Sequence, residues 1–384
     1  MKIQLAKNLR REILRGHPWI YAKALKSLPS LPNAQLAQLA DSKGEPLAWV
    51  LCDPHSPLAV RVLSLERKPP QDSFWQRRFQ RALDLRFPLL NESTNCVRLF
   101  NGEGDLLPGL VCDLYDDTAV IQFDGKGPGE FWNRDQLCGW LVENTPAKTI
   151  VEKFRSGSKE THIVLAGQLS SPEIEVRENN CQYIVNVIEG QKTGFFLDQR
   201  ENRHYVRSFS RELSVVNLFS YSGGFSIAAG LGGAESVTSV DISPGAIELA
   251  ERNWSLNQLT PESHQAIVAD VFEFLLDQSQ TWDCVIVDPP SMAHSEKQKP
   301  QAINKYQELF SLAAKKVTSG GHLVLSSCSS HISFDDFFAI INESLSKARR
   351  RGQVLRISGQ GSDHPFPHIC PELRYLKFAH LALN

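Results

Sequence analysis

From residue 213 onwards, strand-like apolar runs alternate with helical segments, and this alternation limits the possible folds more than any other feature of the sequence. The helical segments include 244–257, for which Ser243 is a good N-cap and Pro244 a good first residue, and 302–317. Strands that are joined by helices form a parallel sheet covered on both faces. We therefore expect an α/β domain with a mostly parallel, doubly wound sheet. Its predicted strands are 214–219, 236–241, 265–270, 284–288 and 322–326.

The remaining sequence predicts two further regions, since 384 residues are too many for one ordinary core. Residues 1–70 contain short strands broken by prolines, with a hairpin-like turn at 41–45. We predict a small β-rich domain there, a central α+β domain at 71–188 and the parallel-sheet domain at 189–384. The central domain has a predicted helix at 72–87 and predicted strands at 97–100, 110–115, 118–123, 149–153 and 183–187. The last two strand-like runs, 353–358 and 373–380, are compatible with an antiparallel edge pair.

The composition predicts a globular protein without a membrane segment or an export signal. No apolar run approaches the ~18 to 20 residues that a membrane span needs, and charges interrupt the N-terminal residues throughout. We therefore expect a cytoplasmic protein. The eight cysteines form no C-x-x-C pair, so no metal site is predicted.

The net charge of −2 is not that of a strongly basic chain, so any nucleic-acid binding has to rest on local clusters of cations. Residues 1–28 hold seven Lys or Arg against the single acid Glu12, and 347–351 holds four more cations. Both runs are candidates to contact phosphates. A solvated face is the alternative for the first run, and a favourable helix end for the second.

A glycine turn follows the first strand of the parallel sheet. The stretch from Val216 to Ala229 has the pattern of a strand, a tight turn at Gly223 and Gly224, and a helix. Asp241 ends the next strand 17 residues after Gly224, close to the offset at which an acid meets ribose hydroxyls in nucleotide-binding folds. Such turns are also common packing devices. The spacing is not G-x-G-x-x-G, which disfavours a nicotinamide oxidoreductase.

Carboxylates stand at three successive strand ends of the predicted sheet. Asp241 and Asp270 end the second and third strands, and Asp288 ends the fourth, followed by Pro289 and Pro290. Ligands of open parallel sheets bind outside the carboxyl ends of the strands. Because carboxylates are unfavourable there without partners, the pattern predicts a shared ligand and substrate site at this edge.

At these strand ends the sequence resembles class I methyltransferases that make 5-methylcytosine in RNA. Asp288-Pro289-Pro290 and Ser327-Cys328-Ser329 carry this resemblance. With the run from Lys192 to Arg203 and the glycine turn, the chain closely resembles the bacterial 23S rRNA large-subunit methyltransferase I family. The likeness extends over nearly the whole chain. The segment from Arg15 to Ile20 resembles the start of the family's RNA-binding PUA domain, and Asp363-His364-Pro365 and Pro371-Glu372 match its C-terminal region.

This resemblance implies a Rossmann-like domain that binds S-adenosylmethionine (SAM), with 23S rRNA as partner and a homodimer as the assembly. Cys328 is the expected nucleophile that adds to C6 of cytosine, and Asp288 is expected to hydrogen-bond the ring edge. Cys284 lies inside a strand and is expected in the core. The expected cofactor-binding residues are Gln199, Arg200, Phe219, Ser220, Tyr221, Gly223, Gly224, Phe225, Asp241, Ile242, Asp270, Val271 and Asp288. Expected substrate contacts are Lys192, Phe195, Pro289, Pro290 and Tyr306, with a core position as the alternative for Phe195 and Tyr306.

Two positions depart from the pattern of relatives that make this modification. The segment Pro289-Pro290-Ser291 stands where some of them carry a second cysteine for product release, and Met292 replaces an expected aromatic residue. The base for the elimination step therefore stays open. The alternatives are methylation of a guanine or adenine nitrogen, which needs no cysteine, and a non-catalytic RNA-binding or ribosome-assembly protein, which the intact Asp241, Asp270 and Asp288 disfavour.

Overall fold

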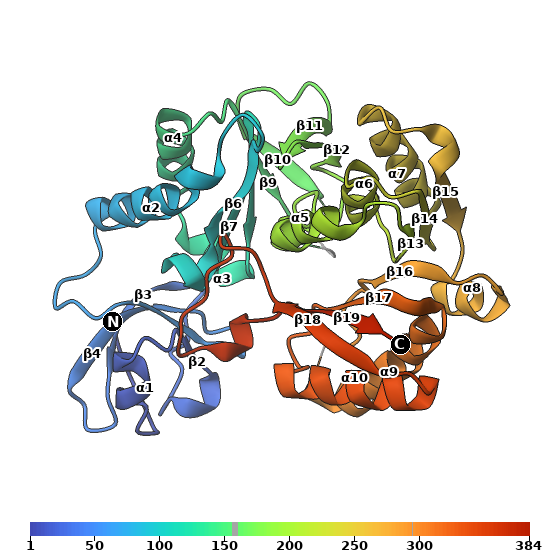
Figure 1. Cartoon of the computed structure of the whole chain (residues 1–384). Coiled ribbons are helices and arrows are strands. Elements are labelled where there is room, and N and C mark those ends of the chain that lie inside the picture. Colours follow the sequence, from blue (N-terminus) through green and yellow to red (C-terminus); the bar gives the residue numbers. More distant parts are fainter. Residues whose placement is uncertain (156–159, 294) are drawn as a thin grey trace. The chain divides into compact units, whose positions relative to one another are not determined.

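The computed structural model describes residues 1–155, 160–293 and 295–384, and these residues form two compact units (Figure 1). The first unit comprises residues 1–176, 185–197 and 362–373, and the second comprises 177–184, 198–361 and 374–384. Within the described ranges, no helix is long and apolar enough to span a membrane.

The first unit begins with a five-stranded sheet in the order β1-β3-β4-β5-β2. The turn between β3 and β4 is the predicted one at 41–45, where the Asp41 carboxylate accepts hydrogen bonds from the backbone of Lys43 and Glu45. The helix α1 (Arg10–Leu14) contributes the buried Ile13 to the core of this sheet. The strands are β1 (Lys2–Gln4), β2 (Trp19–Ile20), β3 (Gln35–Ala40), β4 (Pro46–Cys52) and β5 (Val60–Ser64).

A second five-stranded sheet, in the order β10-β9-β8-β7-β6, packs with α2 (Asp72–Arg86) in the same unit. The predicted helix and four predicted strands are confirmed as α2, β6 (Cys96–Asn101), β7 (Leu110–Tyr115), β8 (Thr118–Phe123) and β9 (Thr149–Lys153). The fifth predicted strand is also confirmed. Residues 183–187 fall mostly in β12 (Cys181–Asn186), which pairs with β11 (Glu173–Glu178) in a separate two-stranded sheet. The five-stranded sheet also contains β10 (His162–Ala166), which was not predicted. The helices α3 (Lys126–Phe131) and α4 (Arg134–Asn144) lie in the same region of the chain.

A buried arginine ties the C-terminal segment 362–373 into this unit. Arg86 is fully buried and forms two hydrogen bonds to the Asp105 carboxylate, at 2.6 and 2.7 Å. It also donates to the backbone oxygen of Asp363 at 2.8 Å, and the Asp363 carboxylate accepts from the backbone of Arg98. Asp363 therefore has a structural role that explains its place in the sequence pattern.

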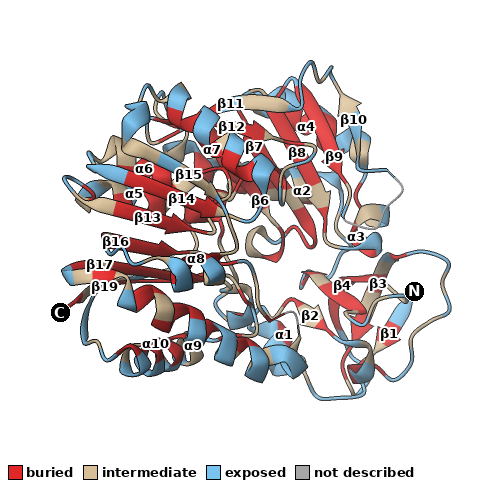
Figure 2. Cartoon of the chain, turned by 90° about the vertical axis from the view of Figure 1, so that its right-hand side faces the viewer, coloured by how far each residue is buried: buried red, intermediate tan, exposed pale blue. Residues whose placement is uncertain are grey.

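The second unit is the predicted α/β domain, a seven-stranded sheet in the order β15-β14-β13-β16-β17-β19-β18. The first five strands along the sheet are parallel, and β19 runs antiparallel to both of its neighbours. Helices α6 and α7 cover one face, while α9 and α10 cover the other (Figure 1), and the strands between them are largely buried (Figure 2). The strands are β13 (Ser214–Leu218), β14 (Ser236–Asp241), β15 (His264–Val268), β16 (Trp282–Val287), β17 (Val317–Ser327), β18 (Gly352–Ser358) and β19 (Lys377–Leu383). The helices are α5 (Arg200–Phe209), α6 (Gly224–Leu231), α7 (Pro244–Leu256), α8 (Val271–Asp277), α9 (Lys299–Lys315) and α10 (Phe334–Ala348).

Most predicted elements of this domain are confirmed, including the Ser243 N-cap, whose side chain accepts from the backbone of Ala246. The last predicted strand, 373–380, is misplaced. Residues Pro371–Leu373 form a 3-10 turn, and β19 begins only at Lys377. The antiparallel pair is confirmed, but β19 lies inside the sheet between β17 and β18.

Breaking the buried Arg86–Asp105 pair should destabilise the first unit. We expect Arg86→Met to lower the free energy of unfolding by roughly 3 to 5 kcal/mol, because the substitution leaves the Asp105 carboxylate buried without its cation. The matched control is Lys148→Met, which removes an exposed ion pair to Asp117 and should change stability little. Urea unfolding of both variants measures the difference. Equal effects would contradict the assignment.

A second prediction concerns His380 on β19, which is buried between Tyr205 and His322 at 2.9 Å from each. Burial lowers the pKa of His380 to about 4, with a further contribution from His322. In the unfolded chain His380 is protonated below pH ~6.5, whereas in the folded chain it stays neutral until about pH 4. The free energy of unfolding therefore falls as the pH drops through this window. We expect His380→Gln to flatten this fall by up to ~1.4 kcal/mol per pH unit. Urea unfolding at a series of pH values would show it. Parallel curves for variant and wild type would refute it.

Candidate active site

The turn between β13 and α6 has an unusual backbone. Phe219, Tyr221 and Gly223 all adopt positive φ angles, of 59°, 46° and 78°. Such conformations are unfavourable for residues other than glycine, and they concentrate at ligand sites. Tyr221 is held by Asp241, whose carboxylate accepts from the Tyr221 and Ser243 backbones at 2.9 Å each. The predicted glycine turn and Asp241 are thus in direct contact.

The same turn carries polar and apolar groups that suit a nucleoside-like ligand. The hydroxyls of Ser220 and Ser222 are buried and have no hydrogen-bond partner among the residues that the structure describes. Ile242, directly after Asp241, leaves 68% of its surface exposed, which is high for a large apolar residue. Buried hydroxyls normally find partners. The turn therefore fits a bound group with a polar part and an apolar face, as SAM has.

Asp288, after β16, is held by a chain of polar side chains, of which Gln199 and Asn202 are buried. Gln199 donates to the Asp288 carboxylate at 2.9 Å, and Asn202 donates to Gln199 at 2.6 Å. Ser358 at the end of β18 donates in turn to Asn202 at 2.7 Å. A connected polar network of this kind fixes the orientation of its members. Gln199 was predicted to touch the cofactor, and the structure gives it a contact to Asp288.

Cys328 follows β17 directly, on the carboxyl edge of the sheet. Its sulfur lies 3.9 Å from the backbone oxygen of Pro289, so the thiol is beside the Asp288-Pro289-Pro290 turn. The other seven cysteines, Cys284 in β16 among them, are buried, whereas Cys328 is partly exposed. The structure thus places the Cys328 thiol beside the turn that follows Asp288, and it confirms the core position of Cys284.

Ser329 links the two loops of this site, a role that the sequence did not indicate. Its hydroxyl accepts from the backbone of Met292 at 3.0 Å and lies 2.9 Å from the Tyr306 hydroxyl. Tyr306 is itself fully buried on α9, and burial raises its pKa to about 12. Ser329 and Tyr306 therefore fix the Pro-Pro loop against the end of β17.

The predicted stacking of Tyr306 or Phe195 on a target base is not supported, because both rings lie in the core. A fully buried ring has no face to offer a base. The core alternative holds for both residues. Phe195 and Lys192 belong to the first unit, where the Lys192 ammonium lies 4.5 Å from the centre of the Phe196 ring.

Asp270 has a simpler structural role than its position suggested. Its carboxylate accepts from the backbones of Phe272 and Glu273 and caps the N-terminus of α8. Capping of α8 is enough to explain an acid at this strand end. Asp270 therefore has partners in the local backbone and does not by itself indicate a ligand site. The remaining predicted cofactor residues Val271, Phe225 and Arg200 are buried, and Arg200 pairs with Glu201 at 3.3 Å.

A buried ion pair supports the glycine turn, and sequence reasoning missed it. Arg203 on α5 donates to both carboxylate oxygens of Glu178, at 2.7 and 2.6 Å. Burial alone would lower the pKa of Arg203, but the Glu178 carboxylate raises it above its ordinary value. A Cβ at Gly224 would lie 3.1 Å from the Arg203 side chain, and the Tyr183 hydroxyl donates to the Gly224 backbone. Arg203 and Tyr183 therefore pack tightly against the start of α6.

The cationic run at 347–351 has in part a structural role. The Arg350 guanidinium donates to the backbone oxygens of Ala314, Val317 and Thr318. This arginine holds the end of α9 and the start of β17, so the prediction that it contacts phosphate is not supported.

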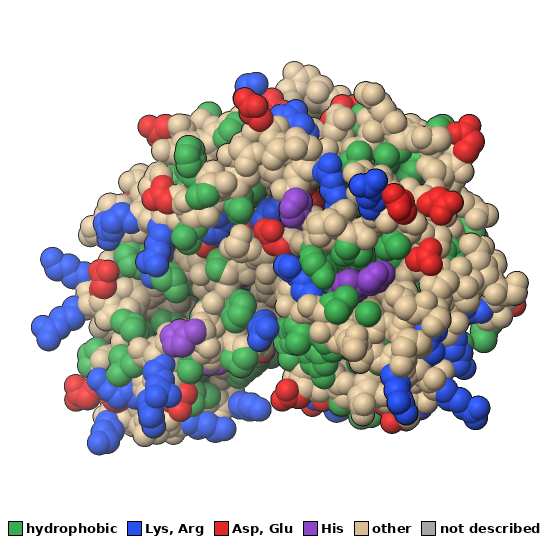
Figure 3. All heavy atoms as spheres, viewed as in Figure 1, with side chains coloured by type: hydrophobic (Ala, Val, Ile, Leu, Met, Phe, Trp, Pro, Cys, Tyr) green, Lys and Arg blue, Asp and Glu red, His purple; other side chains and the backbone are tan. Residues whose placement is uncertain are grey.

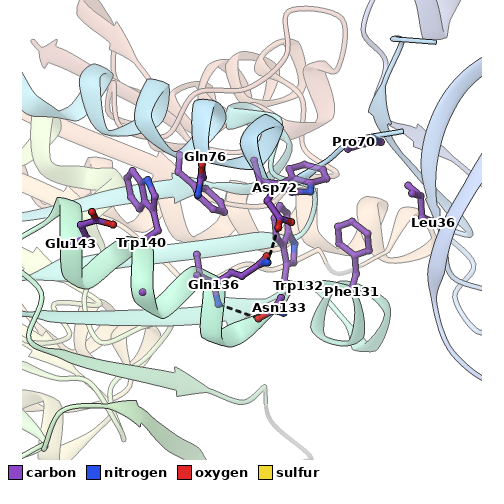
Figure 4. A pocket seen from close by; sticks show the side chains of 14 residues that line it. Leu36, Pro70, Asp72, Gln76, Phe131, Trp132, Asn133, Gln136, Trp140 and Glu143 are labelled. Atoms are coloured by element: carbon purple, nitrogen blue, oxygen red, sulfur yellow. Dashed lines mark hydrogen bonds between the residues drawn. The ribbon is translucent and has the colours of Figure 1, made fainter. Parts of the chain in front are cut away.

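Two features of the first unit lie outside the predicted site. Ligand atoms of His17, Cys370 and Glu372 come within 4.8 Å of one another, and a 3.5 Å ion pair between His17 and Glu372 accounts for part of this proximity. A cavity of about 500 Å³ opens beside α2 and α4 (Figure 4). Its lining includes Trp75 and Trp132, whose rings pack edge to face. All residues lining this cavity belong to the first unit.

Comparison with known proteins finds family models and full-length relatives of this chain. Residues 140–363 match a family model described as S-adenosylmethionine-dependent methyltransferase, and residues 3–65 match a PUA-like domain. A Deinococcus radiodurans protein named ribosomal RNA large subunit methyltransferase is 34% identical over 100% of this chain and 98% of its own. A Pseudoalteromonas atlantica protein named ribosomal RNA large subunit methyltransferase I is 33% identical over 98% of each chain.

Solved structures share the fold. A Streptococcus mutans protein described as a SAM-dependent methyltransferase superposes with a TM-score of 0.87 at 24% identity, over 100% of both chains. A methyltransferase solved with S-adenosylhomocysteine (SAH) gives a TM-score of 0.88, also at 24% identity and full coverage.

The left-handed turn can be tested with two glycines that differ in backbone φ and in the space around them. We expect Gly223→Ala to lower the free energy of unfolding by roughly 1 to 2 kcal/mol, because its φ is +78° and the new Cβ would lie 3.0 Å from the Ala250 side chain. Gly245→Ala in α7 is the control, since a Cβ there has nothing within 4 Å and its φ is not positive. Thermal unfolding of both variants measures the effect. An equally stable Gly223→Ala protein would show that the turn is unstrained.

Proposed function

The chain belongs to the ribosomal RNA large-subunit methyltransferase I family of SAM-dependent methyltransferases, and from this premise we propose that it methylates C5 of a cytosine in 23S rRNA. The observation that carries the proposal is the position of the Cys328 thiol, 3.9 Å from the Pro289 oxygen in the turn that follows Asp288. A nitrogen acceptor would need no thiol here.

SAM would be held along the carboxyl edge by the glycine turn and by Asp241. Its ribose hydroxyls suit the Asp241 carboxylate, and its adenine suits the exposed Ile242. Ser220 and Ser222 supply unpartnered hydroxyls beside Gly223. Bound SAM supplies a methyl group on a positively charged sulfur, which is open to attack by a carbon nucleophile.

Cys328 makes such a nucleophile out of C5 of cytosine, which is too weakly nucleophilic on its own. The thiolate forms a bond to C6, and the electron pair displaced from the C5–C6 double bond makes C5 electron-rich. The methyl transfer to C5 would leave SAH as the second product. A base then takes the C5 proton, and the freed electron pair restores the C5–C6 double bond while the S–C6 bond breaks and the Cys328 thiolate is released. Asp288 contacts the ring edge during addition. Ser291 offers no second thiol, so elimination has to proceed without one.

The substrate side of the proposal rests on the N-terminal module. A PUA-like domain suits recognition of folded RNA by shape. The seven Lys and Arg residues of 1–28 are exposed, and Figure 3 shows Lys and Arg side chains on the surface of this domain. The target cytosine has to leave its stack to reach Cys328. This substrate would place the protein in the cytoplasm. The division at residues 70 and 188 and the homodimer are further parts of the proposal.

Replacing the thiol tests both product and mechanism. We expect wild type to form 5-methylcytidine in unmethylated rRNA, and Cys328→Ala to lose at least ~1,000-fold in rate because the carbon nucleophile no longer forms. Mass spectrometry of the digested nucleosides measures this. Ser330→Ala, an exposed neighbour, is the matched control and should retain full activity. A different methylated base, formed equally well by Cys328→Ala, would contradict the proposal and favour a nitrogen acceptor.

A further inference from the structure

Lys377 opens β19 and is fully buried, which is rare for a lysine. It pairs in register with Ser327, the residue before Cys328. Its ammonium donates to the backbone oxygens of Ser329 at 2.6 Å and of Tyr375 at 2.7 Å. The Ser329 carbonyl belongs to the residue directly after Cys328. Lys377 therefore holds the backbone directly after Cys328, the proposed nucleophile.

Among the residues that the structure describes, Cys328 and Asp336 are the groups whose charge acts on Lys377. Burial lowers the pKa of Lys377 to about 8, and a negative charge on Cys328 or on Asp336 raises it. Asp336 on α10 is itself bound to Lys299 at 2.8 Å, and on α9 the neighbouring titratable group is Tyr306. Electrostatic influence is mutual, so an ammonium that a thiolate stabilises also stabilises that thiolate. At neutral pH the lysine is mostly protonated.

We propose that the Lys377 ammonium holds the Cys328 segment in place and stabilises the Cys328 thiolate, which makes Lys377 a positioning residue for the nucleophile. This inference rests on the proposed function only in giving Cys328 its task. Lys377 is not itself catalytic, because a fully buried ammonium with two carbonyl partners touches no substrate. A thiolate is the reactive form of cysteine, and a nearby cation is a common means of producing it.

The test measures the thiol rather than methylation. Because Cys328 is partly exposed and the other seven cysteines are buried, the rate of alkylation of the folded full-length protein by iodoacetamide reports mainly on Cys328. Cys328→Ser corrects for any background. The pH dependence of this rate gives the thiol pKa, which we expect to lie below the ordinary ~8.5.

Lys377→Met retains the length of the side chain and removes its charge. We expect the thiol pKa to rise by about one unit, so that alkylation near neutral pH slows ~10-fold, and methylation to fall in parallel and recover at higher pH. Lys315→Met, on the exposed side of α9, is the matched control and should change neither rate. Lys377→Arg should keep the low pKa if the larger cation is accommodated.

The outcomes separate the two proposals. A wild-type thiol pKa at or above ~8.5 would overturn the inference without any variant, so it stays testable even if Lys377→Met fails to fold. An unchanged pKa in folded Lys377→Met, with methylation reduced, would show a purely structural lysine and also overturn it. A pKa that depends on Lys377, in a protein that forms no 5-methylcytidine, would support the thiol activation and refute the proposed function instead.

Discussion

The parallel register of β13 with β14 and β16 is the constraint on which the site depends. Leu218 pairs with Val240 on one side and with Val287 on the other, so three strands end at the same level. The residues that follow them, the glycine turn and the segments of Asp241 and Asp288, therefore meet at one edge although they are far apart in sequence. β17 continues the series and brings Cys328 to the same edge. A register shift in any one of these strands would separate the Cys328 thiol from the glycine turn.

Beneath this edge the site is supported by polar side chains that are almost all buried. Gln199 and Asn202 connect Asp288 to the end of β18, and Ser329 connects the Pro-Pro loop to α9. Glu178 and Arg203 lie under the start of α6. Polar groups in a core are unfavourable unless they are fully paired, and paired groups fix one arrangement. The carboxyl edge thus rests on the strands of the sheet and on a specific layer of polar side chains.

The sequence predicted the features that are encoded locally. The strand–helix alternation, the Ser243 cap and the positions of Asp288 and Cys328 after their strands all follow from periodicity and turn chemistry. The errors concern tertiary partners. A lysine at 377 has no local signature that distinguishes a buried cation from an exposed one, and the aromatic ring of Tyr306 has the same helical spacing in a core as in a pocket. The position of β19 inside the sheet depends on pairing with β17, which lies about fifty residues earlier and leaves no short-range pattern.

Asp270 and Asp288 show why an acid at a strand end is not sufficient to identify a site. Asp270 caps α8 through backbone groups two and three residues away, so the local chain alone explains it. Asp288 is instead oriented by Gln199, 89 residues earlier, within a network that extends to Ser358. A cap needs only a helix that begins at the next residue. The network around Asp288 needs polar side chains from distant parts of the chain that hydrogen-bond one another. Their hydrogen bonds to one another compensate for their burial, and the same bonds fix the orientation of Asp288. The carboxylate whose support comes from distant elements is therefore the one that the proposed chemistry uses.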